Sequence, residues 1–135
     1  TLNLKKMCAI LCGLSFGILM VFGRGIFLEA IGDRRADYNA VSVSILYSSF
    51  WYGCLVLLTF FYKKSDEYYF LALFYLCIFS VASLLGDYSS RYLVLSLPFI
   101  ITSLCRMDQK ISHIWLVLFI FQTVVQWVYW FQLQV

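Results

Sequence analysis

Charged residues are scarce in this chain. Asp, Glu, Lys and Arg together make up 13% of its 135 residues, about half the share that is typical of soluble domains. The chain also has a single proline and a single histidine. A shortage of both charge and proline excludes a collagen-like or intrinsically disordered chain. The few cations fall in short clusters between apolar runs rather than along one basic face, which excludes nucleic acid as a partner.

A metal site or a disulfide framework is not expected either. The five cysteines lie inside or at the ends of apolar runs, they form no C-x-x-C pair, and His113 is the only histidine. Structural metal sites and disulfide frameworks need clustered ligands or regularly spaced cysteines. We therefore interpret the cysteines as small buried hydrophobic residues and His113 as an interfacial residue, and we expect no metal and no cofactor.

Apolar residues, by contrast, make up 63% of the chain. A soluble fold of this size could not bury so much apolar surface, and the excess would aggregate. The sequence therefore predicts an all-α, polytopic transmembrane helix bundle whose main contact is the lipid bilayer. Its five apolar segments are Met7–Gly23, Val41–Tyr62, Tyr68–Gly86, Tyr92–Cys105 and a run from about Ile111 to about Phe131.

The fourth segment, Tyr92–Cys105, is the shortest and contains Pro98. A helix needs about 20 apolar residues to cross a bilayer, and a run of this length reaches only about 21 Å. It is either a short spanning helix, extended at one end, or a re-entrant helix kinked at the proline. We favour the short spanning helix.

The chain begins without methionine and ends inside a hydrophobic run. We interpret residues 1–135 as a single transmembrane helical region of a longer polytopic protein. Its partners would then include the remaining transmembrane helices, in the same or in another chain.

The basic residues predict an orientation. Cytoplasmic loops of membrane proteins carry an excess of Lys and Arg, which favours a cytoplasmic N-terminus in an integral, multi-pass protein. All lysines then fall inside, whereas four of the five arginines fall outside. The inner set is Lys5, Lys6, Lys63, Lys64, Arg106 and Lys110, and the outer set is Arg24, Arg34, Arg35 and Arg91. Because arginine offers a rigid fork for phosphate, outer arginines indicate an anion-binding role.

The outer segment from Arg24 to Asn39 is the richest in polar chemistry. Its apolar centre predicts a short amphipathic turn on the membrane, bracketed by breaks at Gly25 and Gly32. The charged part that follows predicts an extracytoplasmic phosphate site or, alternatively, a solvated loop whose charges pair locally. In the first case Arg34 and Arg35 bind phosphate, Asp33 or Asp37 is the candidate catalytic base, and Tyr38 lines the site.

A second outer cluster lies at the start of the fourth segment. Arg91 there either pairs with Asp87 or faces a cavity and binds a ligand phosphate, with Tyr92 beside it. Farther along, Gln122 and Gln126 lie four residues apart in the fifth segment. Such a stripe forms interhelical hydrogen bonds or lines a substrate site.

The stretch Arg91-Tyr92-Leu93-Val94-Leu95-Ser96-Leu97-Pro98 resembles the Arg-Tyr-Leu-x(4)-Pro stretch of multispanning GT-C-type glycosyltransferases. The outer arginines are similar in placing to those of polysaccharide repeat-unit polymerases, whose Arg-x-x-x-Tyr element is matched by Arg34 and Tyr38. The acidic motif that GT-C enzymes carry in their first outer loop is not identifiable here. The resemblance implies that the arginines hold a polyprenyl-(di)phosphate-linked sugar at the extracytoplasmic face during glycosyl transfer.

Two other functions compete with this enzyme. The chain could be a non-enzymatic membrane subunit or scaffold, because its many bulky aromatic side chains (20% of residues) suit static packing against partners. It could also be part of a transporter or flippase. The transporter is disfavoured because the predicted spans have no charged residue near their middle, where transport sites usually place one.

Overall fold

The structure is a computed structural model that describes residues 3–32, 45–63, 66–85 and 89–133. All the regular structure in these ranges is α-helical, which confirms the predicted fold class at this level. The helices are α1 (Leu4–Ala30), α2 (Ile45–Phe61), α3 (Glu67–Leu84), α4 (Ser89–Cys105) and α5 (Gln109–Leu133).

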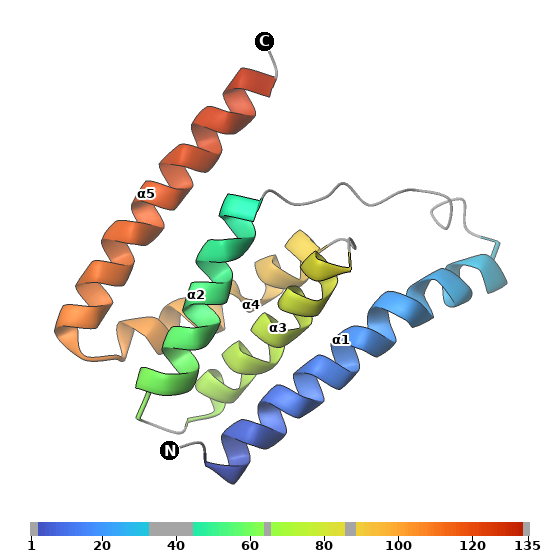
Figure 1. Cartoon of the computed structure of the whole chain (residues 1–135), viewed down its shortest axis with the longest axis horizontal. Coiled ribbons are helices and arrows are strands. Elements are labelled where there is room, and N and C mark those ends of the chain that lie inside the picture. Colours follow the sequence, from blue (N-terminus) through green and yellow to red (C-terminus); the bar gives the residue numbers. More distant parts are fainter. Residues whose placement is uncertain (1–2, 33–44, 64–65, 86–88, 134–135) are drawn as a thin grey trace.

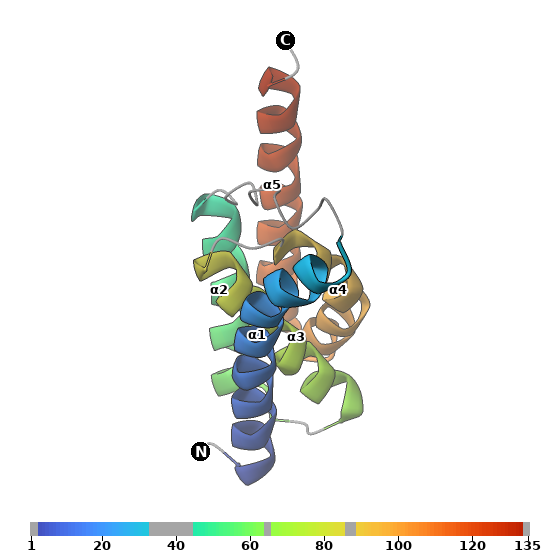
Figure 2. The same ribbon diagram turned by 90° about the vertical axis from the view of Figure 1, so that its right-hand side faces the viewer.

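Successive helices run in opposite directions, and α3 lies at the centre (Figure 1). Helices α1, α2 and α4 each pack against α3, whereas α5 contacts α2 and α4. The two views agree that the C-terminal part of α5 projects beyond the other helices (Figures 1 and 2). We call the end of the bundle that holds the start of α1 and the α2–α3 and α4–α5 turns the basal end (Figure 1). The opposite end, which holds the start of α4, is the apical end.

Helices α1 and α3 approach each other closely. A Cβ atom added at Gly13 would lie 2.7 Å from the carbonyl oxygen of Phe74, and one added at Gly17 would lie 3.1 Å from the Cβ atom of Val81. The two glycines form a G-x-x-x-G pair, a pattern that lets two helix backbones approach closely in membranes. The prediction of static packing by bulky aromatic side chains did not include this pair of small residues.

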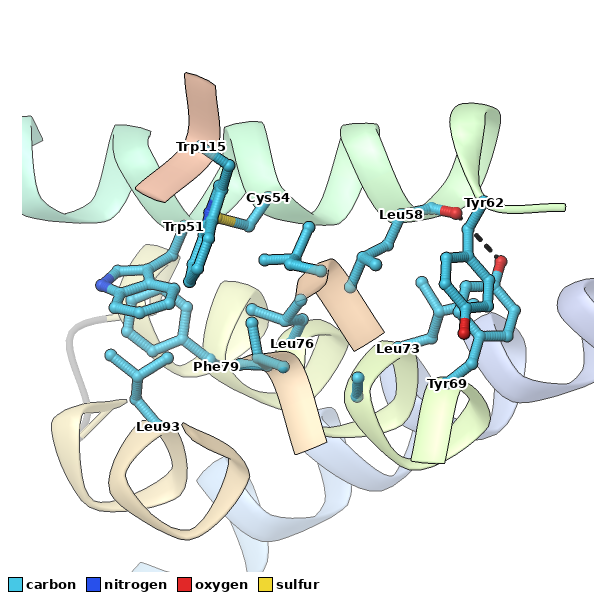
Figure 3. Packing of buried hydrophobic residues seen from close by; sticks show 13 residues of the cluster. Trp51, Cys54, Leu58, Tyr62, Tyr69, Leu73, Leu76, Phe79, Leu93 and Trp115 are labelled. Carbon is cyan, nitrogen blue, oxygen red and sulfur yellow. Dashed lines mark hydrogen bonds between the residues drawn. The ribbon is translucent and has the colours of Figure 1, made fainter. Parts of the chain in front are cut away.

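The core lies between α2, α3 and α4, with one contribution from α5 (Figure 3). Leu58, Leu76 and Phe79 are fully buried there. Trp115 is the residue through which α5 enters the core, and its indole Nε1 donates a hydrogen bond to Cys54 Sγ at 3.1 Å. Cys54 and Cys77 are buried as expected, whereas Cys8, Cys12 and Cys105 are exposed, so for these three the prediction of buried cysteines is wrong.

Three helical stretches are long and apolar enough to cross a membrane: α1, α3 and residues Gln109–Tyr129 of α5. Two of these helices, α1 and α5, are poorly covered by the rest of the structure. Only 11% of the apolar segment of α1 and 6% of that of α5 is buried. Their exposed side chains are mostly large and apolar, including Leu19, Phe22, Phe121 and Trp127. A surface of this kind suits lipid or further helices better than water.

Two predicted boundaries are corrected by the structure. Helix α1 continues through Gly25 to Ala30, so the predicted break at Gly25 and the separate amphipathic turn are wrong. The chain turns at Gly32, which has a φ of +67°, a conformation that glycine adopts without strain. The fourth helix begins at Ser89 rather than Tyr92, and with 17 residues it shares the shortest length with α2. Pro98 lies inside it, as expected.

Candidate functional site

The structure describes only part of the predicted phosphate site. Arg91 lies in the first turn of α4, where its side chain is exposed, and Tyr92 beside it is half-buried. The other predicted members, Asp33, Arg34, Arg35, Asp37 and Tyr38, lie outside the described residues, as does Asp87. Arg91 is therefore the one predicted phosphate ligand whose place in the fold is known.

The remaining predicted residues lie on other helices. Arg24 is half-buried within α1, and Gln122 and Gln126 are half-buried on α5. His113 is exposed in the first turns of α5, where its Nδ1 lies 2.6 Å from the carbonyl oxygen of Gln109. No group of His, Cys, Asp and Glu side chains that could hold a metal ion occurs among the described ranges.

The best-defined polar cluster lies instead at the basal end of the bundle, and we call Lys6, Tyr62, Asp66, Tyr69 and Arg106 the basal network. Lys6 reaches from α1 to the end of α2, where its Nζ donates to the carbonyl oxygens of Tyr62 at 2.7 Å and Thr59 at 3.4 Å. The last carbonyls of a helix have no partner within it, so Lys6 supplies one from a different helix. Its Nζ also lies 5.3 Å from the centroid of the Tyr69 ring, a cation–π contact.

Asp66 is the centre of the basal network. It is the N-cap of α3, and its Oδ1 accepts a hydrogen bond from the backbone N–H of Tyr69 at 3.0 Å. Its Oδ2 accepts from the hydroxyl of Tyr62 at 3.2 Å and from Nη1 of Arg106 at 2.6 Å. One carboxylate thus joins α3 to the turn after α2 and to the turn after α4.

These contacts decide the protonation state of the carboxyl group. Partial burial by itself raises the pKa of Asp66, but the bonds from Arg106, from the Tyr69 backbone and from Tyr62 outweigh it and hold that pKa below its ordinary value. The opposite holds for the neighbouring phenol, because burial and the nearby charge of Asp66 raise the pKa of Tyr62. At neutral pH the network therefore contains an ionised Asp66 and a neutral Tyr62.

Aromatic rings hold the network in place from the core side. The rings of Tyr62 and Tyr69 stack with their centroids 4.5 Å apart and their planes 14° apart. The Tyr69 ring is fully buried, and its hydroxyl donates to the carbonyl oxygen of Leu58 at 3.1 Å (Figure 3). The guanidinium of Arg106 lies 5.2 Å from the centroid of the Tyr68 ring.

A hollow of about 150 Å³ lies next to the network, between the α2–α3 turn and the α4–α5 turn. Its wall combines two cationic side chains with an acidic one and three apolar or aromatic ones, and consists of Phe61, Tyr62, Lys63, Arg106, Met107 and Asp108. The hollow has room for several non-hydrogen atoms rather than for a single water molecule. Its lining can bind a small group that carries charge of both signs.

The sequence interpretation missed this network, although one of its members left a signal. Asp66 directly precedes the apolar run of α3, which is the position and residue type of a helix N-cap. Arg106 lies 40 positions from Asp66, and the two carbonyl groups that Lys6 binds lie 53 and 56 positions from it, so no local sequence pattern indicates these contacts. No protein-family model, curated protein sequence or solved structure matches this chain.

Proposed function

We propose that this chain is a membrane-embedded helical region of an enzyme that transfers a glycosyl unit from a polyprenyl-(di)phosphate-linked sugar. Membrane embedding is supported by three helical stretches of spanning length and apolar composition. It is further supported by the apolar side chains that α1 and α5 leave exposed, since hydrocarbon is the solvent in which such a surface is stable.

The observation that carries the enzymatic part of the proposal is the position of Arg91. Its exposed side chain lies in the first turn of α4, where the helix dipole is positive and backbone N–H groups lack partners within the helix. A phosphate placed there meets a guanidinium and a helix N-terminus together. Residues 34 and 35, which the proposal assigns to the same phosphate, belong to the connection from α1 to α2.

In the proposed reaction, the bond between the anomeric carbon and the phosphate oxygen breaks while the acceptor hydroxyl oxygen bonds to that carbon. The hydroxyl proton passes to a base, for which Asp33 and Asp37 are the candidates. The leaving group is a polyprenyl (di)phosphate whose negative charge increases in the transition state. Arg91, with Arg34 and Arg35, would stabilise that charge.

Binding of a polyprenyl diphosphate tests the proposal without knowledge of the sugar. We expect this compound to raise the unfolding temperature of the detergent-solubilised protein, and the corresponding polyprenol, which lacks phosphate, to have no effect. Arg91→Lys keeps the charge but loses the planar fork, so the shift should become much smaller. Arg106→Lys makes the same exchange at the opposite end of α4, so it is the matched control and should keep the full shift. A full shift in the Arg91→Lys variant would overturn the proposal.

The non-enzymatic alternative, a subunit or scaffold of a larger complex, is favoured by one observation. Helix α5 is almost uncovered within its apolar stretch Gln109–Tyr129, and further helices could cover it. This alternative predicts a folded protein that is indifferent to polyprenyl diphosphate. The same thermal experiment therefore separates the two functions.

A further inference from the structure

We propose that the hollow at the basal end binds the headgroup of a phospholipid that carries a primary ammonium group. The phosphate would lie between Lys63 and Arg106, and the ammonium would bind Asp108. The proposal rests on the membrane embedding proposed above but not on the enzymatic activity, because Arg91 lies at the other end of α4.

The place of the hollow fits a headgroup. It lies where two helices end and one begins: Phe61 is the last residue of α2, Cys105 is the last of α4, and α5 starts at Gln109. In a bilayer the ends of spanning helices lie at the level of the headgroups. The apolar walls, Phe61 and Met107, would then contact the glycerol and the first carbons of the acyl chains.

The charges around the hollow indicate a ligand with charge of both signs. Lys63 and Asp108 line the same hollow, yet neither has a salt-bridge partner among the residues that the structure describes. A ligand in this hollow that carries charge of both signs could pair with both side chains. A purely anionic headgroup would place its phosphate in the same hollow as the Asp108 carboxylate, with no positive group of the ligand to pair with that carboxylate. The two negative charges would repel each other.

Arg106 is oriented toward this role by the basal network. It binds Asp66 through Nη1 and stacks over Tyr68, while its side chain lines the hollow. A guanidinium has five N–H donors, so one bond to Asp66 leaves donors for a phosphate oxygen. The Asp66 pair thus restricts the conformations of Arg106 before a ligand binds.

A primary ammonium fits better than a quaternary one. Quaternary ammonium groups have no N–H donor and are recognised by cages of aromatic ring faces. In this hollow the ring of Tyr62 stacks on Tyr69, which occupies one of its faces, and the acidic group available is a carboxylate. A carboxylate forms charge-assisted hydrogen bonds with a primary ammonium. The expected ligand is therefore a phosphatidylethanolamine.

The test measures the unfolding temperature of the full chain in detergent as one lipid is added at a fixed mole fraction. Phosphatidylethanolamine should raise it by a few degrees, and more than phosphatidylcholine or phosphatidylglycerol do. Asp108→Asn should remove the difference between phosphatidylethanolamine and phosphatidylcholine. Lys63→Gln should reduce the response to all three lipids. Glu67→Gln removes a charge at the same end without altering the wall of the hollow, so it should respond as the unmodified protein does.

Equal shifts from the three lipids, a larger shift from phosphatidylglycerol, or an unchanged preference in Asp108→Asn would each overturn the proposal. Soluble phosphoethanolamine at the same concentration distinguishes the source of the group, and an equal shift from it would show that no lipid is required and would also overturn the proposal. Arg91→Lys should leave the response to phosphatidylethanolamine intact. A chain extracted from membranes by alkaline carbonate would instead contradict membrane embedding itself, so the two failures are distinguishable.

Discussion

Arg106 Nη1 lies 2.6 Å from Asp66 Oδ2, and this ion pair fastens the turn after α4 to the residue that caps α3. The two residues are 40 positions apart in the chain. Both side chains are partly exposed, at 45% and 28%, and exposed ion pairs in water contribute little free energy. The cap that the same carboxylate provides should therefore matter more to stability than the pair.

Two substitutions at Asp66 separate the cap from the charge. Asp66→Asn keeps a side-chain oxygen that can accept from the Tyr69 N–H, whereas Asp66→Ala removes the cap and the pair together. We expect Asp66→Ala to lower the free energy of unfolding by about 1 kcal/mol and Asp66→Asn to have a smaller effect. Unfolding of detergent-solubilised protein, followed by circular dichroism, measures both. Equal losses would mean that the charge and not the cap stabilises this end.

The lowered pKa of Asp66 predicts a pH dependence. A carboxyl group whose pKa is lower in the folded state stabilises the protein fully above the unfolded pKa, about 3.9 for Asp. That contribution is lost as the pH falls through the lower, folded value. The stability difference between the unmodified protein and Asp66→Asn should thus be constant from neutral pH down to about pH 5 and shrink below about pH 4. A difference that persists unchanged in acid would contradict the lowered pKa.

The close contact of α1 with α3 predicts a position-dependent effect of alanine. Gly13→Ala places a Cβ atom 2.7 Å from the Phe74 carbonyl oxygen, so the two helices must separate and the unfolding temperature should fall. Gly23→Ala is the matched control in the same helix, because nothing lies within 4 Å of the added atom. It should be neutral or slightly stabilising, since alanine favours helix over glycine. Similar effects at both positions would show that the two helices do not approach at Gly13.

The charge distribution predicts how the bundle is oriented in the membrane proposed above. Lys6, Lys63 and Arg106 gather at the basal end, and basic residues favour the cytoplasmic side. A compartment-sensitive reporter fused after Lys64 should therefore report the cytoplasm, and one fused after Arg91 should report the opposite side. Reports from the same side would remove the extracytoplasmic site from the proposal.

The helices could be predicted because each one is a long apolar run. The break predicted at Gly25 is wrong because a glycine inside a helix costs only about 1 kcal/mol relative to alanine, which the rest of the long helix α1 outweighs. The G-x-x-x-G pair at Gly13 and Gly17 was visible in the sequence and shows that small residues should be considered together with aromatic ones.

The polar site was harder to predict than the helices. Asp66 has a local signal because a cap must directly precede its helix. Lys6 and Arg106 have none, because their roles depend on which helix ends meet in space. Arginine has a specific chemistry toward phosphate, whereas lysines at the cytoplasmic end of a membrane protein are usually generic anchors, so the residue types favoured the outer arginines over the basal end.

Because the other described helices cover so little of α5, the thickness of the membrane proposed above would affect how this helix is inclined. The 21-residue apolar stretch of α5 is about 32 Å long, close to the thickness of a hydrocarbon core of about 30 Å, and the helix is fixed to its neighbours near Trp115 and Phe119. Beyond these residues its large apolar side chains are exposed, so the surrounding medium determines the tilt of this part of the helix. A thicker membrane would reduce the tilt of α5 and a thinner one would increase it. The rotation would centre on Trp115, and the packing of α1 to α4 would stay unchanged.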